Sequence, residues 1–203
     1  GLRHDFSRIS GSRDYARQVP RVTYEDLFPW IQSLVEGQSG HLTADPVLSF
    51  SLTSGTTSAP KWIPVTARDR ATRDRLSLLW LYRAFCDHPA FLDGSVLCIS
   101  AAPVEGFTSG GIPYGSASGQ IFQGVPILSS AMRVLPPELT GIRNYDLRYY
   151  LMARLAYERE VSFIVTPNPL TLVRMVEAGI RYQETIIRSI RAGGIIGKHE
   201  VLF

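Results

Sequence analysis

The sequence predicts an α/β fold in layers, with a largely parallel sheet flanked by helices. Short continuous apolar runs, typical of strands buried on both faces, alternate with longer segments whose apolar residues recur at helical spacing. The chain has 203 residues and 45% of them are hydrophobic, which is enough for a substantial core in one large or two small domains. No internal repeat is evident in the chain.

The first half of the chain is predicted to hold two main helices and two strands. Residues 1–18 are polar and aperiodic, and we expect them to form a short helix and a lead-in. Thr23 is an N-cap followed by acidic residues, and Gly37 is a stop, so a helix is expected to reach about Glu36. Strands are predicted over 47–53 and 62–65, and a capping-type start at Thr66 predicts a helix to about Cys86. The first helix is expected to carry Leu27, Trp30, Ile31 and Leu34 on one face. The apolar residues of the second are Leu76, Leu79, Leu81, Tyr82 and Phe85.

The second half continues the alternation of strands and helices. Between the two halves lies a stretch, 105–124, that contains six glycines interleaved with aromatic residues. We expect it to lack regular structure, and a segment of that length is usually functional or disordered. The predicted elements are a strand over 95–101, a helix over 144–160, a strand over 161–166, a helix over 170–178 ended by Gly179, and a last helix over 182–192.

The most informative segment is residues 53–61, which directly follows the first predicted strand. Loops of Gly, Ser and Thr can turn their amides inward to bind an anion, and a lysine adds a positive charge suited to phosphate. The segment therefore indicates a nucleotide phosphate site, although its spacing is not that of the G-x-x-x-x-G-K-[ST] loop. The alternative is a polar surface loop between two strands. The residues concerned are Thr53, Ser54, Gly55, Thr56, Thr57, Ser58 and Lys61.

These residues, read as T-S-G-T-T-S-A-P-K, resemble the phosphate-loop signature of the adenylate-forming, firefly luciferase-like superfamily. Ser58 stands where most members have a second glycine. The continuation W-I-P-V-T is similar to that of the auxin-responsive promoter family of acyl acid amido synthetases. Three further segments resemble that family in the right order, namely V-P-R-V-T-Y-E-D-L at 19–27, V-S-F-I at 161–164 and N-P-L at 168–170.

The resemblance implies an enzyme that uses ATP and Mg²⁺ to convert a carboxylic acid into an acyl-adenylate and then transfers the acyl group to an amine or amino acid. It implies that residues 53–58 cradle the triphosphate and that Lys61 lies near the outer phosphates or braces the loop. A strand-edge lysine in solvent is the alternative for Lys61. Tyr114 and Ser116 would lie near the acyl and nucleotide cleft, with a packed hairpin as the alternative. The catalytic residues are not indicated.

Members of that family are much longer than this chain. The resemblance therefore implies that residues 1–203 are an incomplete N-terminal domain, with the C-terminal domain absent, and that the chain is an inactive fragment. Two other hypotheses remain open: a fragment of a related acyl-CoA ligase, and a stand-alone binding or scaffold protein. In the last case an exposed edge of the core would be covered by a partner, for example in a homo-oligomer.

Composition argues against several other classes of protein. The net charge is +3, and basic residues are mixed with acidic ones, so nucleic-acid binding is not expected. No signal peptide or apolar segment long enough for a membrane is recognised, which predicts a cytoplasmic protein without membrane partners. The histidines are scattered and the cysteines isolated, so no protein-ligated metal site is expected. The G-x-S-x-G pattern of a nucleophile elbow is excluded at 115–119 because Ala117 replaces the serine.

Overall fold

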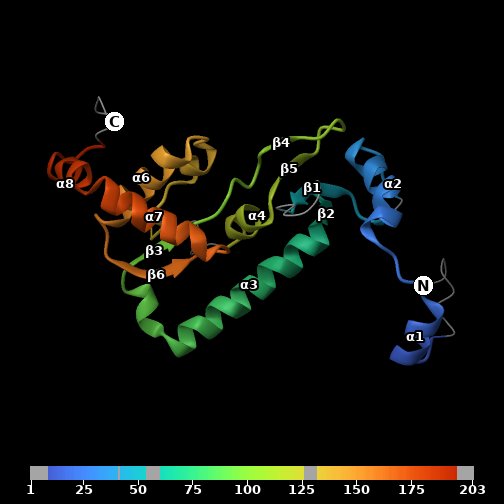
Figure 1. The fold of residues 1–203 in the computed structure, drawn as a ribbon. Coiled ribbons are helices and arrows are strands. Elements are labelled where there is room, and N and C mark those ends of the chain that lie inside the picture. Colours follow the sequence, from blue (N-terminus) through green and yellow to red (C-terminus); the bar gives the residue numbers. More distant parts are fainter. Residues whose placement is uncertain (1–8, 41, 54–59, 126–131, 196–203) are drawn as a thin grey trace.

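The computed structural model describes residues 9–40, 42–53, 60–125 and 132–195, and Figure 1 shows its elements spread along an elongated molecule. The chain order agrees with the predicted alternation of strands and helices. The helices are α1 Ser12–Gln18, α2 Tyr24–Val35, α3 Ala67–Asp87, α4 Ala117–Gln123, α6 Tyr145–Ala156, α7 Pro169–Arg181 and α8 Gln183–Arg191. The strands are β1 Val47–Leu52, β2 Trp62–Thr66, β3 Ser95–Cys98, β4 Gly106–Phe107, β5 Pro113–Ser116 and β6 Val161–Val165, and short 3₁₀ helices cover Pro89–Leu92 and Pro137–Gly141.

The larger sheet has the strand order β2-β1-β5-β4 and is mixed, so the expectation of a largely parallel sheet is wrong for this sheet. β1 pairs with β5 in parallel, whereas the β1–β2 and β4–β5 pairs are antiparallel. The reason is the length of the connections: short polar loops join each antiparallel pair, and a parallel pair needs a long crossover.

Helices cover both faces of this sheet near β1. On one face, Ile31 and Leu34 of α2 are buried against Phe50. A capping box between Thr23 and Asp26 fixes the start of α2, as the sequence predicts. Trp30, which we expected on the same face as Ile31 and Leu34, is 49% exposed. On the helix it lies at the margin of the buried stripe formed by Ile31, Leu34 and Val35.

The second sheet consists of β3 and β6, which pair in parallel and supply the edge of a separate core. The largest cluster of buried side chains lies here, between β3 and α6, α7 and α8. Gly179 does not end α7 as predicted, because the helix continues to Arg181. A Cβ at Gly179 would collide with the Tyr157 ring, so this glycine permits close packing between α7 and the end of α6.

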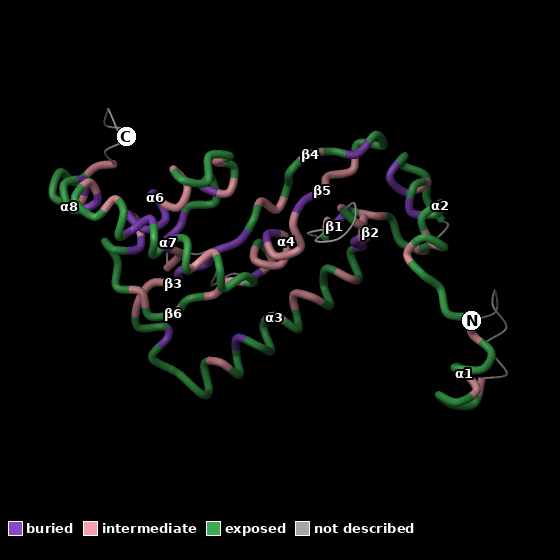
Figure 2. Tube along the Cα trace, viewed as in Figure 1, coloured by how far each residue is buried: buried purple, intermediate pink, exposed green. Residues whose placement is uncertain are grey.

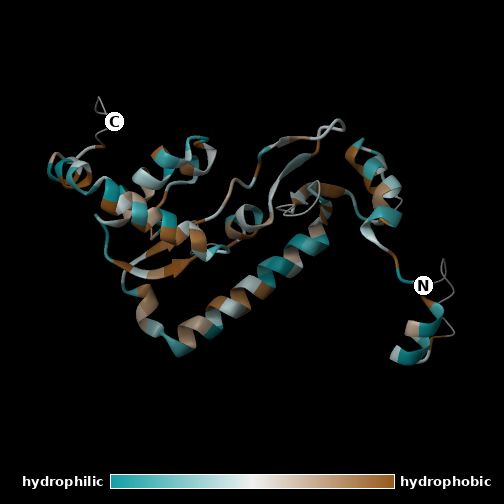
Figure 3. Cartoon of the chain, viewed as in Figure 1, coloured by the Kyte–Doolittle hydropathy of each residue, from teal (hydrophilic) through white to brown (hydrophobic). Residues whose placement is uncertain are grey.

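Helix α3 forms as predicted, but most of its residues are not buried. The helix is present over 21 residues, but among its residues only Leu81 is buried. Figure 2 shows most of α3 as exposed or intermediate, and Figure 3 shows apolar and polar residues alternating along it. The other apolar residues named for this helix are exposed: Leu76, Leu79, Tyr82 and Phe85, at 60%, 63%, 65% and 39%.

The glycine-rich stretch is ordered, contrary to the expectation that it lacks regular structure. It forms β4, a tight turn, β5 and α4. Gly110 donates from its amide to the Val35 carbonyl at 3.0 Å, and a Cβ on it would meet the backbone of Gly37. Glycine is therefore required there by the close approach of the hairpin to the end of α2.

Candidate functional site

The parallel pairing of β1 and β5 brings the predicted site residues to one edge of the larger sheet. Leu52 lies opposite Ser116 in this register. Because both strands run in the same direction, Thr53 and Ser116 leave the sheet side by side at its carboxyl end. In open α/β sheets, ligands bind outside the carboxyl ends of the strands.

The base of the candidate phosphate loop is closed by two hydrogen bonds. The Thr53 amide donates to the Lys61 carbonyl, and the Lys61 amide donates to Thr53 Oγ1, both at 3.2 Å. Five of the predicted cradle residues lie between these ends and outside the described residues: Ser54, Gly55, Thr56, Thr57 and Ser58. The cradle itself therefore stays a prediction, while its anchor points are defined.

The Lys61 side chain contacts helix α2. Its Nζ lies 4.9 Å from the centroid of the Tyr24 ring and 3.9 Å from a carboxylate oxygen of Glu25. The next residue, Trp62, donates its amide to the Tyr24 hydroxyl at 2.8 Å. These contacts tie the Lys61 side chain to α2, and its role toward the loop or the phosphates stays a prediction.

Tyr114 and Ser116 both make defined contacts within the fold. The Tyr114 ring packs edge-on against Trp62, with ring centroids 4.9 Å apart, and Trp62 in turn packs on Phe50. Ser116 caps α4, accepting a hydrogen bond from the Gly119 amide at 2.9 Å. These contacts resemble the packed-hairpin alternative, and a role for either residue in binding substrate remains a prediction.

A polar layer beneath the loop was not anticipated from the sequence. Ser51 is 3% exposed and donates to Gln120 Oε1 at 2.8 Å. Gln120 Nε2 donates to the Phe50 carbonyl at 3.0 Å, and Arg73 Nη1 reaches Ser51 Oγ at 3.4 Å. The alternation of Ser49 and Ser51 with apolar residues in β1 is the signal that could have predicted this polar face.

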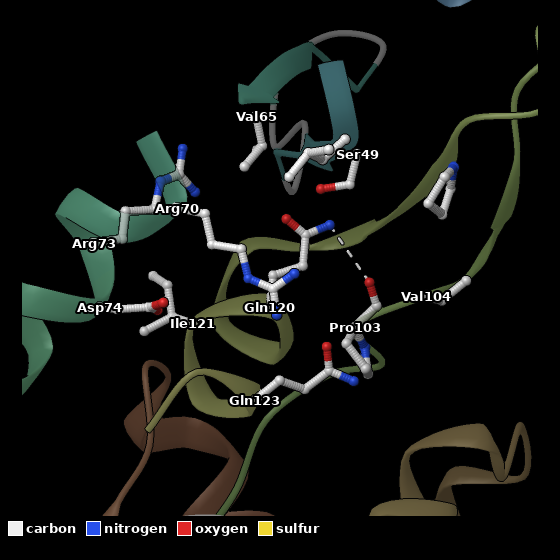
Figure 4. A pocket seen from close by; sticks show the side chains of 12 residues that line it. Ser49, Val65, Arg70, Arg73, Asp74, Pro103, Val104, Gln120, Ile121 and Gln123 are labelled. Atoms are coloured by element: carbon white, nitrogen blue, oxygen red, sulfur yellow. Dashed lines mark hydrogen bonds between the residues drawn. The ribbon is translucent and has the colours of Figure 1, made fainter. Parts of the chain in front are cut away.

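Figure 4 shows Arg73 and Gln120 of this layer, with Arg70 and Gln123, around a hollow between the sheet, α3 and α4. The cavity has a volume of about 130 Å³ and includes Arg70, Arg73, Gln120 and Gln123 among its lining residues. Arg73 also pairs with Asp69 at 2.7 Å. The layer ties α3 and α4 to the end of β1, so it fixes the strand from which the loop departs.

The buried cysteine Cys98 is not suited to act as a nucleophile. Burial raises the pKa of the Cys98 thiol to about 11, although Arg133 opposes that shift. This thiol is therefore protonated near neutral pH. Within the described residues no group of three or more His, Cys, Asp or Glu side chains could hold a metal ion, and no helix has the length and apolar character needed to cross a membrane.

A comparison of the sequence with protein families identifies the domain that contains this sheet edge. The profile of the GH3 family N-terminal domain matches residues 1–199. The chain belongs to the GH3 family. Because the match spans nearly the whole chain, both sheets and the candidate loop fall within the GH3 N-terminal domain.

Two plant GH3 relatives match most of the chain at low identity. The indole-3-acetic acid-amido synthetase GH3.10 of Arabidopsis thaliana is 26% identical over 189 residues, which cover 87% of this chain and 32% of the relative. The jasmonoyl-L-amino acid synthetase JAR6 of Nicotiana attenuata is 24% identical over 185 residues, covering 86% of this chain and 32% of the relative. The chain spans about a third of the length of these relatives.

A solved structure supports the same fold. The GH3.15 acyl acid amido synthetase superposes with a TM-score of 0.76 at 20% identity, covering 97% of this chain and 35% of that chain. A structure of AtGH3.15 in complex with 2,4-DB gives a TM-score of 0.74, also at 20% identity. The mixed α/β architecture described above is therefore that of the corresponding part of a GH3 protein.

Proposed function

We propose that this chain supplies the nucleotide-binding part of an ATP-dependent acyl acid amido synthetase. The reaction would activate a carboxylic acid as its acyl-adenylate, release pyrophosphate and pass the acyl group to an amine or amino acid. Membership of the GH3 family and the amido synthetase names of the curated relatives support this class of reaction.

The observation that carries the proposal is the position of the candidate loop. Its two ends, Thr53 and Lys61, are clamped together at the carboxyl edge of the parallel pair β1 and β5. Between them lie only small, mostly hydroxyl-bearing residues and one proline. A loop of that composition, held at that edge, is suited to present amides and hydroxyls to a polyanion.

The chemistry follows from the charge that develops in the reaction. When the acid's carboxylate attacks the α-phosphate, negative charge grows on the leaving pyrophosphate. Fixed amides and hydroxyls of residues 53–58 would stabilise that charge more than water does, because they need no reorganisation. Mg²⁺ would arrive with the triphosphate and neutralise part of its charge, since this ion is usually held through phosphate oxygens and only one or two protein groups.

The remaining assignments are part of the same proposal. Lys61 would brace the loop through Tyr24 and Glu25, or would place its ammonium near the outer phosphates. Tyr114 and Ser116 would line the way to the acid. The 203-residue chain would be an incomplete N-terminal domain that binds nucleotide in the cytoplasm, and turnover would require the polypeptide that its longer relatives possess.

Nucleotide binding by the 203-residue chain tests the proposal directly. We expect ATP with Mg²⁺ to bind in isothermal titration, and Thr53→Ala and Thr56→Ala each to weaken binding about tenfold, which corresponds to about 1.4 kcal/mol. Thr72→Ala is the matched control, because this exposed hydroxyl bonds only within α3. Absence of ATP binding by the folded chain, or equal binding by all four proteins, would contradict the proposal.

A further inference from the structure

A second hollow lies between α4 and the segment that carries Arg133. It has a volume of about 240 Å³, and its lining comes from the end of α4, from Ser100 and Pro103 after β3, and from parts of 133–140. Pockets for drug-sized ligands measure about 300–1,000 Å³, so this hollow suits a smaller ligand. It is a separate cavity from that of Figure 4, although Pro103 and Gln123 line both.

The backbone around Arg133 is fixed against β3. The Val96 amide donates to the Met132 carbonyl at 2.8 Å, and the Val134 amide donates to the Val96 carbonyl at 3.0 Å. Arg133 pairs with Val96 in this short parallel bridge, and paired residues project to the same face of a sheet. Val96 belongs to a buried cluster that packs against Phe122 of α4. The Arg133 side chain therefore lies on the α4 side of the sheet.

The Arg133 guanidinium carries a buried donor without a partner. Its Nε is buried and makes no hydrogen bond. No acidic residue lines this hollow or the narrow cavity next to it, and all of the lining residues are described. Glu138, the nearest acid in the sequence, is exposed and lines neither cavity. A buried charge without a partner is strongly unfavourable, so this group calls for a ligand that supplies one.

A second positive charge adjoins the first. Arg148 lines the narrow cavity together with Arg133, and it donates to the Ser100 carbonyl at 2.7 Å. Cys98 lines the same cavity, but burial raises the pKa of its thiol to about 11 although the Arg133 charge opposes that shift. The thiol is neutral near pH 7 and does not compensate the two arginines. Their charges match an anion that carries more than one negative charge.

The other groups around the hollow are uncharged. The Ser100 hydroxyl and the Gln123 carboxamide can donate hydrogen bonds, whereas the Thr140 hydroxyl already donates to the Pro137 carbonyl at 2.7 Å. The rest of the wall is mostly apolar and includes Phe122, Leu135 and Pro136. Such a lining offers donors to an anion and an apolar surface to any organic group attached to it.

We propose that this hollow binds a phosphate group, either as inorganic phosphate or as a small phosphate monoester. The phosphate oxygens accept hydrogen bonds from the Arg133 guanidinium, and the apolar wall accommodates the organic part of an ester. Arginine binds phosphate through two parallel N–H···O bonds. A phosphate monoester carries about 1.5 to 2 negative charges at pH 7, which matches two arginines better than the single charge of a carboxylate. The proposal does not require residues 53–61 to hold a nucleotide.

Thermal unfolding of the 203-residue chain tests this proposal. A ligand that binds only the folded state raises the melting temperature as its concentration rises. We expect millimolar phosphate to raise the melting temperature relative to chloride of equal ionic strength. Acetate is the carboxylate probe, and an equal or larger rise with acetate would overturn the preference for phosphate. Phenyl phosphate distinguishes the two sources: a larger rise than with inorganic phosphate identifies an ester, and an equal rise identifies free phosphate.

Three variants locate the site and correct for general salt effects. Arg133→Met removes the charge and keeps an apolar stem, so it should melt no lower than wild type in chloride and bind phosphate about tenfold more weakly or worse. Gln123→Glu places a carboxylate in the pocket wall, where it pairs with Arg133, and should also abolish the rise. Arg143→Met, at an exposed arginine outside the pocket, should keep it.

Two outcomes would overturn the site: no rise in the folded wild-type chain, or a rise that survives both Arg133→Met and Gln123→Glu. If Arg133→Met melts far below wild type in chloride, the premise of an unpaired charge is wrong. Gln123→Glu leaves Arg133 in place, so it tests phosphate binding even if the first variant fails to fold.

The proposed nucleotide loop could itself bind phosphate, so Thr53→Ala is measured alongside. We expect this variant to keep the phosphate-dependent rise, and we expect Arg133→Met to keep its affinity for ATP. Loss of the rise in Thr53→Ala would assign the phosphate to residues 53–61 and overturn the Arg133 site. Failure of ATP to bind would contradict the nucleotide proposal and leave the phosphate result at Arg133 standing.

Discussion

Helices α6 and α3 both contain many apolar residues but differ in how far these residues are buried. Six of the 12 residues of α6 are buried, whereas a single residue, Leu81, is buried in the 21 of α3. Helix α6 lies between the β3–β6 pair and helices α7 and α8, which cover it. Helix α3 crosses from one sheet to the other with much of its apolar surface open, as Figure 2 shows.

This difference shows that the spacing of apolar residues predicts which face of a helix is apolar, but not which part of the protein covers that face. A contiguous apolar surface on a monomer usually marks an interface. The longer GH3 relatives have about three times the length of this chain, and we expect polypeptide of that kind, or a second copy of the chain, to cover α3. The predictions below test this contrast.

The largest effect is expected at Arg154, which holds α6 to the end of α8. It is 2% exposed and bonds Ser189 Oγ at 2.7 Å, Glu158 Oε2 at 2.7 Å and the Gly194 carbonyl at 3.1 Å. Arg154→Ala should lower the free energy of unfolding by about 3–5 kcal/mol, because its partners lose their donors in a buried place. Urea denaturation measures this change.

The control for Arg154 is Arg174→Ala, in an exposed pair with Glu177. Exposed pairs contribute about 0–1 kcal/mol. Equal losses of unfolding free energy in both variants would mean that Arg154 does not hold α6 to the end of α8.

A matched pair of truncations compares the two helices directly. Met152→Ala in α6 removes a side chain that is 1% exposed, and Leu79→Ala in α3 removes one that is 63% exposed. We expect losses of about 2–4 kcal/mol for the first and under about 0.5 kcal/mol for the second. A large loss at Leu79 in thermal or urea unfolding would show that α3 is covered in solution.

Self-association should depend on α3. The chain is expected to form dimers or larger species at high concentration, and the double variant Leu79→Lys with Tyr82→Lys should remain monomeric in sedimentation velocity. Because both positions are open, the melting temperature should change little. A wild-type chain that stays monomeric throughout would show that this face does not recruit a second copy.

The smallest effect is expected from pH at Glu158. The hydrogen bond from Arg154 lowers the pKa of this carboxyl below its ordinary value of 4.5. A depressed pKa stabilises the folded state above pH 4.5, and this contribution is lost as the pH falls through the folded-state pKa. The carboxyl is 43% exposed, so Glu158→Gln should cost under about 1 kcal/mol at pH 7.

The measurement is the difference in unfolding free energy between wild type and Glu158→Gln from pH 7 to pH 3. That difference should shrink below pH 4.5, where wild-type Glu158 becomes protonated. A difference that stays constant over this range would mean that the hydrogen bond from Arg154 does not lower the pKa of Glu158.

Much of the fold could be predicted because its signals are local. Thr23 and Thr66 cap α2 and α3 as expected, since an N-cap needs only its own first turn. The pairing of strands could not be predicted in the same way. β1 and β2 are close in the sequence, but the parallel pairing of β1 with β5 joins residues 64 positions apart, such as Phe50 and Tyr114.

The candidate site was likewise predicted only where its signal is local in the sequence. The composition of residues 53–61 predicted an anion loop, and the structure places its ends at the sheet edge beside Ser116. The polar layer of Ser51, Gln120 and Arg73 and the Arg133 pocket escaped prediction. Each joins side chains from separate elements, and no spacing along the chain records that proximity.

The sequence by itself determined the approximate starts of the helices and strands outside 105–124, the polar loop between β1 and β2, and the resemblance that the family match bears out. These depend on backbone preferences and on runs of neighbouring residues. Only the tertiary structure decided that the larger sheet is mixed, that α3 lies uncovered while α6 is buried, and that Arg133 lines a hollow without an acid. Those outcomes depend on which distant surfaces exclude water from each other, and that is a property of the packed chain.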